Sequence, residues 1–231
     1  MQIIPRFPKE SARDYALRFL KHNIINLHLK PGTMVSVWEL ADIIGVSRTP
    51  IREAMQELEK TGILEIFPQA GSRISYIDYE RIHESCFIRT TLETTIVELA
   101  CGRMTREHKA EIEDILRIQR KTTSQNKPGD FLELDYRFHR QFYLAANREL
   151  TYQTVKDVLW QFDRLRTISF TTVDPMQFVR EHEELYGAVK SGDKRLAKKL
   201  TMRHVNRYLD DEKALRAKYP EYFQKVPQKQ V

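Results

Sequence analysis

The chain of 231 residues has no long apolar run, and it contains only two cysteines. Without an apolar stretch of roughly eighteen residues, a membrane-spanning helix is excluded. The first ten residues hold two prolines and no apolar core, so we expect no secretory signal there. Cys86 and Cys101 have neither disulfide nor metal spacing, and we expect buried free thiols in a reducing compartment. These absences predict a cytoplasmic protein with no membrane partner.

Motifs of common catalytic sites are also missing. The sequence has no His-Glu-x-x-His zinc motif, no glycine-rich phosphate loop and no Gly-x-Ser-x-Gly nucleophile elbow. The net charge of +6 is compatible with a polyanionic partner but does not require one. Residues 190–225 hold eleven lysines and arginines against five acidic residues, whereas residues 1–77 hold ten against eight. The charge total is therefore weak evidence for DNA binding, and only the arrangement of residues can indicate it.

Residues 11–77 show the pattern of several short helices. Apolar residues repeat with a helical period across residues 11–28. Two further short helices follow, and each has a serine cap at its start and a glycine at its end. The caps are Ser36 and Ser47, and the terminating glycines are Gly45 and Gly62. Two capped helices with a short turn between them predict a helix-turn-helix.

Two short apolar runs come next, at residues 63–67 and 73–77. The turn Pro68-Gln69-Ala70-Gly71 separates them. Strand, Pro/Gly turn and strand predict a hairpin. Directly after a helix-turn-helix, such a hairpin is the wing of a winged helix-turn-helix.

The start of the second capped helix carries the chemistry for DNA binding. Ser47, Arg48, Thr49 and Arg52 lie there, away from the apolar face of the helix. In a helix-turn-helix this end enters the major groove of DNA. Arginine can bond guanine or phosphate, and the hydroxyls and free N–H groups can hold a phosphate. A solvated helix face would explain two arginines alone, but the capped helices and the hairpin beside them favour DNA contact.

Three stretches within residues 11–76 have a specific order: Leu29-Lys30-Pro31-Gly32, Glu39-Leu40-Ala41 and Gly45-Val46-Ser47-Arg48-Thr49-Pro50-Ile51-Arg52-Glu53-Ala54. They resemble the DNA-binding domain of the GntR family of bacterial regulators, and the match continues through Leu58 and Gly62 to Gly71. This resemblance implies that Arg48 and Arg52 contact DNA and that the wing tip at Gly71 enters the minor groove. Because the tip carries no basic residue, Arg73 is the candidate to replace one.

Residues 78–231 have a helical pattern throughout, with few glycines and prolines. The breaks between amphipathic segments predict six or seven helices, and no alternating strand pattern occurs, which indicates an all-α bundle. The predicted fold class is therefore mainly α. A winged helix-turn-helix occupies residues 1–77, and an all-helical domain for effector binding and dimerisation occupies residues 78–231. We expect the tail from Lys213 to Val231 to be a frayed, solvated end.

Four potential metal ligands lie in the predicted helices of the second domain. Asp135 and His139 are four residues apart, which places both side chains on one helical face. Together with His182 and His204 they would suit Zn²⁺, with Ni²⁺ or Mn²⁺ as alternatives. An Asp–His pair with this spacing is also common as a surface pair or a satisfied core pair, and spacing alone cannot bring the two later histidines together. The glutamates beside His182, namely Glu181, Glu183 and Glu184, are expected to form a solvated face.

Several stretches of the second domain also follow a recognisable order: Arg89-Thr90-Thr91-Leu92-Glu93, Asp135-Tyr136-Arg137-Phe138-His139, Ala146-Asn147, Glu181-His182, Ser191-Gly192-Asp193 and His204. They resemble the FadR C-terminal effector domain found in the same family. This resemblance implies that Asp135 and the three histidines hold a metal ion, and that Arg89 pairs with a carboxylate of a small effector. The alternative for Arg89 is a salt bridge to Glu93 one turn further along its helix.

The sequence therefore predicts a homodimeric transcription regulator, and not an enzyme. It is expected to be a repressor that binds pseudo-palindromic operator DNA and responds to a small organic acid at a metal site. One alternative is an enzyme in which the metal activates water. Another is a regulator whose metal only holds the bundle together and whose effector binds without it. The missing catalytic motifs favour the regulator.

Overall fold

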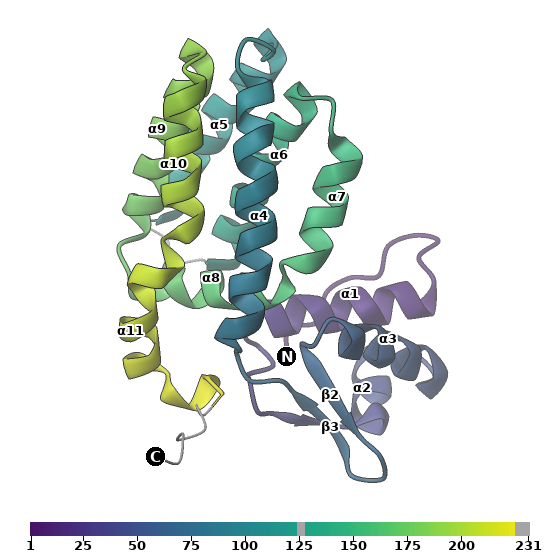
Figure 1. Cartoon of the computed structure of the whole chain (residues 1–231). Helices are drawn as coiled ribbons and strands as arrows, with labels where there is room; N and C mark the ends of the chain where they lie inside the picture. Colours follow the sequence, from purple (N-terminus) through teal and green to yellow (C-terminus); the bar gives the residue numbers. More distant parts are fainter. Residues whose placement is uncertain (124–127, 225–231) are drawn as a thin grey trace. The chain divides into compact units, whose positions relative to one another are not determined.

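The computed structural model describes residues 1–123 and 128–224, which form two compact units (Figure 1). The first unit comprises Met1–Tyr79 together with the described residues from Arg216 to Gln224. The second unit is Glu80–Leu215. Across the described residues, none of the helices combines the length and the apolar character that crossing a membrane requires.

The first unit contains the predicted winged helix-turn-helix. Its helices are α1 (Ala12–Ile25), α2 (Val37–Ile44) and α3 (Arg48–Lys60), and Gly45 ends α2 in the left-handed conformation, with φ 67°. Strands β1 (Met34–Val35), β2 (Leu64–Phe67) and β3 (Gly71–Ile74) form an antiparallel sheet in the order β1-β3-β2. The helix-turn-helix and the hairpin are confirmed. The sequence missed β1 because two residues are too few to show a strand pattern.

Helix α3 has one buried face, and this fixes which of its residues face solvent. Ile51, Ala54, Met55 and Leu58 are all buried, and α1 packs against α3. These four apolar positions follow the 3.6-residue period of a helix. The opposite face, which includes Arg48 and Arg52, is exposed. Burial of the apolar stripe therefore directs the candidate DNA-contacting residues outward.

The second unit is all helical within the described residues. Its helices are α4 (Tyr79–Ala100), α5 (Arg106–Thr123), α6 (Pro128–Ala145), α7 (Glu149–Val158), α8 (Trp160–Thr172), α9 (Pro175–Ser191), α10 (Lys194–Asn206) and α11 (Tyr208–Lys218). These eight helices exceed the six or seven expected. The breaks at Leu159 and Arg207 contain neither glycine nor proline, so the sequence gives no sign of them.

Helix α8 lies in the interior of the helical unit. Every residue from Trp160 to Phe170 is buried, including polar and charged ones. It packs against α6 and α7, while α5 packs against α6 and α9, and α9 packs against α10 (Figure 1). Because a buried helix cannot leave its charges in water, the charged residues of α8 need partners inside the bundle.

The end of the chain differs from its expectation. Tyr222 and Phe223 are buried, and the Tyr222 carbonyl accepts a hydrogen bond of 2.8 Å from the Ile77 N–H. The Phe223 ring stacks on Tyr79 with 5.6 Å between centroids. The prediction of a frayed, solvated tail is therefore wrong up to Gln224, because two aromatic side chains gain burial in the first unit. Residues 225–231 lie outside the described residues.

Candidate nucleic-acid interface and metal centre

The first turn of α3 offers uncapped hydrogen-bond donors. Ser47 has the extended backbone of an N-cap residue, with φ −70° and ψ 165°, but its hydroxyl accepts no capping hydrogen bond. Ser47, Arg48, Thr49 and Arg52 are all exposed. Helix N-termini carry partial positive charge together with unsatisfied N–H groups. The start of α3 is therefore suited to an anionic partner.

The arginines of the first unit's Met1–Tyr79 segment fall into two groups. Four of the six are bonded to a carboxylate or a carbonyl oxygen, namely Arg6, Arg13, Arg18 and Arg73. Arg48 and Arg52 form no hydrogen bond or ion pair with any residue that the structure describes. The guanidinium of Arg48 instead stacks on the Trp38 ring, 3.6 Å from its centroid. Of the three arginines that the sequence assigned to DNA contact, Arg48 and Arg52 are thus the two whose N–H donors are not used by any described residue, whereas Arg73 is paired.

The wing lies beside this surface. Gly71 at its tip has φ 100°, a conformation that favours glycine. Arg73, the candidate basic residue of the wing, pairs with Glu65 on the neighbouring strand at 2.8 Å, so its charge is partly balanced. A hollow of about 820 Å³ is lined by Trp38, by Arg52 and by residues 66–72. The start of α2, the exposed face of α3 and the wing tip therefore border one space.

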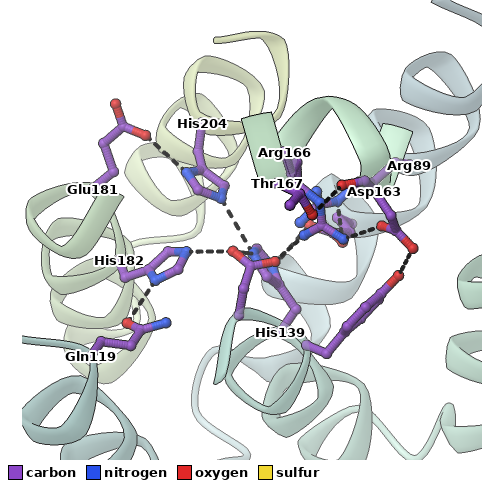
Figure 2. Close-up of polar contacts among 12 residues, drawn as sticks. Arg89, Gln119, His139, Asp163, Arg166, Thr167, Glu181, His182 and His204 are labelled. Carbon is purple, nitrogen blue, oxygen red and sulfur yellow. Dashed lines mark hydrogen bonds and ion pairs between the residues drawn. The ribbon is translucent and has the colours of Figure 1, made fainter. Parts of the chain in front are cut away.

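In the second unit, the structure brings the four predicted metal ligands together. Asp135 and His139 lie on α6, His182 on α9 and His204 on α10, and all four are buried. One ligand atom from each residue lies within 4.8 Å of all the others. Figure 2 shows the rings of His139, His182 and His204 converging from three helices. The Nε2 atoms of His139 and His204 are 3.3 Å apart, and the Nε2 of His182 is 3.3 Å from Asp135 Oδ1.

Each imidazole is held from its outer side by an oxygen acceptor. The Nδ1 atoms of His182 and His204 contact Gln119 Oε1 at 3.0 Å and Glu181 Oε2 at 2.9 Å, respectively (Figure 2). The Nδ1 of His139 lies 3.1 Å from Glu93 Oε2, close enough for an ion pair but without the geometry of a hydrogen bond. An oxygen acceptor at Nδ1 places the proton there, which leaves the lone pair on Nε2. Three Nε2 atoms and a carboxylate oxygen thus converge on one buried spot. This is the arrangement of metal-binding histidines with outer carboxylate and amide partners.

The protonation states also suit cation binding. Burial lowers the pKa of His139, despite the neighbouring Glu93, and lowers the pKa of His182 to about 3. Burial opposes ionisation of Asp135, but Arg166 and the neighbouring histidines outweigh it and hold the pKa of Asp135 well below its usual range. At neutral pH the cluster therefore contains a carboxylate and at least two neutral imidazoles.

Three buried arginines surround the cluster, and each pairs with a carboxylate of the chain. Arg166 of α8 bonds both Asp135 and Asp163, the latter at 2.5 Å. Arg89 pairs with Glu93 at 2.8 Å, which is the salt bridge that the sequence left as an alternative. Arg207 pairs with Glu181 at 2.8 Å. The sequence did not identify Arg166 or Arg207, because charged residues with helical spacing are usually exposed.

The glutamates beside His182 do not form one solvated face. Glu183 and Glu184 are paired with arginines at the surface. Glu181 is buried and bonds both His204 and Arg207, so the prediction was wrong for this residue. The face of α9 that carries Glu181 packs toward α10, and only the fold reveals this.

The space next to the cluster is small. A cavity of about 20 Å³ is lined by residues that include Arg89, Asp135, Arg166, His204 and Arg207. Such a volume holds about one water molecule. An organic acid needs more room, so its binding requires the surrounding helices to open or side chains to move.

The chain matches two protein-family models. Residues 16–74 match the model described as bacterial regulatory proteins, gntR family, and residues 84–207 match the FCD domain. The curated protein "HTH-type transcriptional repressor RspR" of Escherichia coli strain K12 is 27% identical over 217 residues, which cover 94% of this chain and 95% of that protein. An HTH-type transcriptional regulator in an unstable DNA locus of Streptomyces ambofaciens is 31% identical over 217 residues, covering 93% of this chain and 90% of that protein. Among solved structures, E. coli McbR/YncC has a TM-score of 0.76 at 20% identity, covering 91% of this chain and 99% of that one, which supports the fold.

Proposed function

The chain is a DNA-binding transcription regulator that belongs to the GntR family and carries an FCD domain, and we propose that it is a metal-dependent repressor controlled by a small organic acid. The observation that carries the metal-dependent part is the convergence of Asp135, His139, His182 and His204. Glu93, Gln119 and Glu181 lie at the Nδ1 atoms of the three histidines, so the Nε2 atoms are directed inward. The four residues come from three helices, so the fold itself assembles the cluster.

DNA recognition is assigned to the exposed start of α3. Arg48 and Arg52 supply N–H donors for bases or phosphates, and the uncapped first turn supplies backbone N–H groups. The hollow lined by Arg52 and residues 66–72 places the wing beside the same surface. We propose a homodimer, formed through the helical unit, which presents two such helices to a pseudo-palindromic operator.

The donor set fits a divalent cation. Without a cation, inward lone pairs and a carboxylate oxygen face one another in a buried place, which is unfavourable. His182 Nε2 lies 3.3 Å from Asp135 Oδ1 without forming a hydrogen bond. Imidazole and carboxylate ligands suit Zn²⁺, with Ni²⁺ and Mn²⁺ as alternatives. When bound, the ion supplies positive charge that can attract a carboxylate oxygen of the effector.

Arg89 is the residue proposed to hold the effector carboxylate. Its guanidinium is already bonded to Glu93, and Glu93 also holds His139. An incoming carboxylate would compete with Glu93 for Arg89, so effector binding would disturb the outer support of a metal ligand. Because the adjoining cavity is only about 20 Å³, this exchange also requires the bundle to open. A rearrangement of that kind can alter DNA affinity by a coupling free energy of about 1–3 kcal/mol.

A second proposal, in which the metal has only a structural role, is also supported by the structure of the helical unit. The small cavity and the Arg89–Glu93 ion pair also fit a metal that only holds the bundle together, with the effector bound elsewhere. The two proposals share the metal site and differ in what an organic acid does. Both fail if no metal binds.

Metal content tests the shared part. We expect about one divalent ion per purified chain, lost in the Asp135→Ala and His182→Ala variants, because a closed protein site needs its full ligand set. Elemental analysis of the three proteins measures this. His28→Ala, which removes an exposed histidine of the first unit, should keep the ion. If the purified protein held no metal, and took up none from added Zn²⁺, Ni²⁺ or Mn²⁺, the metal proposal would be wrong.

A further inference from the structure

Trp38 is an exposed aromatic residue next to the recognition surface. It lies near the start of α2 and is 60% exposed, although tryptophan usually buries most of its surface. Met34 and Phe67, which line the same hollow, are also exposed. The Trp38 ring therefore does not serve to fill the core of the first unit, and its role has to be sought in its contacts at the surface.

The ring is in contact with Arg48. The guanidinium carbon of Arg48 lies 3.6 Å from the ring centroid, and among the described residues no carboxylate or carbonyl competes for this guanidinium. A stacked guanidinium uses its flat face and keeps its N–H edge available. Arg73 differs from Arg48, because its guanidinium donates hydrogen bonds to the Glu65 carboxylate. Trp38 thus restrains Arg48 without using the donors that DNA would need.

We propose that Trp38 is a positioning residue for DNA recognition, which holds the guanidinium of Arg48 in the orientation that contacts the operator. This inference rests on the proposed role of α3. A free arginine side chain loses rotamer entropy when DNA fixes it, and a rigid aromatic support reduces that loss on binding. Among the described residues, Arg48 and Arg52 form no ion pair with an acidic residue, so their charges are available to a polyanion.

The test compares two duplexes of equal length. One is selected by the wild-type protein from a randomised DNA pool, and the other is a scrambled version of it. For Trp38→Ala we expect the Kd of the selected duplex to rise roughly two- to fivefold, the range that an exposed cation–π contact supplies. The Kd of the scrambled duplex should change less, so the selectivity ratio falls. Trp38→Phe, which keeps an aromatic face, should retain most of the ratio.

A matched control is available in the N-terminal segment. Phe7 is 56% exposed and lies under Arg18 at 4.0 Å, but Arg18 is also bonded to Glu10. Phe7→Ala removes an equivalent aromatic–arginine contact away from α3, and it should leave the selectivity ratio unchanged. Circular dichroism melting curves check that each variant is folded.

A double-mutant cycle identifies the route of the effect. If Trp38 acts through Arg48, then Trp38→Ala should have no further effect in an Arg48→Ala background. Additive losses, or a wild-type selectivity ratio in Trp38→Ala, would overturn the inference while leaving the proposed function intact. If the wild-type protein enriched no duplex from the pool, the proposed function would fail and this inference would fail with it.

Discussion

The Arg48→Ala variant is expected to bind its selected DNA duplex roughly 10- to 100-fold more weakly than the wild type, in line with the value of a bidentate base contact. Arg48 is exposed and has no hydrogen bond or ion pair within the described chain, so its removal costs the folded protein little. Arg52→Ala should weaken binding as well. If Arg52 contacts a phosphate, its loss should make the slope of the logarithm of the binding constant against the logarithm of the salt concentration shallower by about one. Fluorescence anisotropy at several salt concentrations measures both effects.

The control for this experiment is an arginine with partners of its own. Arg13 lies on α1, 3.2 Å from Asp14 and 3.8 Å from Glu57. We expect Arg13→Ala to change the Kd of the selected duplex by less than about twofold, the scale of a surface ion pair. Unchanged binding in both Arg48→Ala and Arg52→Ala would contradict the assignment of DNA recognition to the start of α3.

Arg166→Met is expected to lower the free energy of unfolding by about 3–5 kcal/mol. Its guanidinium bonds Asp135 and Asp163, and these carboxylates are 2% and 0% exposed. Methionine fills similar volume but carries no charge, so both carboxylates would be left buried without their arginine. Urea unfolding followed by circular dichroism measures the change. The protein should be treated with a chelator first, because a bound ion would compensate Asp135.

Arg180 supplies the matched comparison for Arg166. It pairs with Asp174 at 3.0 Å, and both side chains are more than half exposed. Arg180→Met should therefore cost less than about 1 kcal/mol. If both variants lowered the free energy of unfolding equally, burial would not be the reason that the Arg166 ion pairs stabilise the protein.

The features predicted correctly from the sequence are those encoded locally. N-cap serines, terminating glycines and an apolar helical stripe all lie within a few residues of the elements they define. The winged helix-turn-helix could therefore be predicted from the sequence. The pair Asp135 and His139 shares one turn of α6 for the same reason. His182 and His204 were candidates from their residue type and helical setting, but only the family resemblance implied that they join Asp135 and His139, since spacing says nothing about contacts between α6, α9 and α10.

The features that the sequence did not reveal depend on tertiary packing. Glu181 bonds His204 and Arg207 across two helices, yet in sequence it resembles its exposed neighbours. Charged residues of α8 such as Arg166 have the pattern of a surface helix, because nothing local indicates burial on all sides. The chain end is similar, since Phe223 is buried through contacts with residues more than a hundred positions away. Long-range partners of buried charges were therefore the main omission.

Control of DNA binding by the buried cluster is tested most directly by measuring the Kd of the selected duplex with metal-loaded protein, with and without small mono- and dicarboxylic acids. At least one acid is expected to change the wild-type Kd by roughly 5- to 150-fold. His204→Ala should bind the duplex normally without acid and show no response to it. A wild-type Kd that no acid changes, or a normal response in His204→Ala, would contradict the proposal that the cluster senses an organic acid.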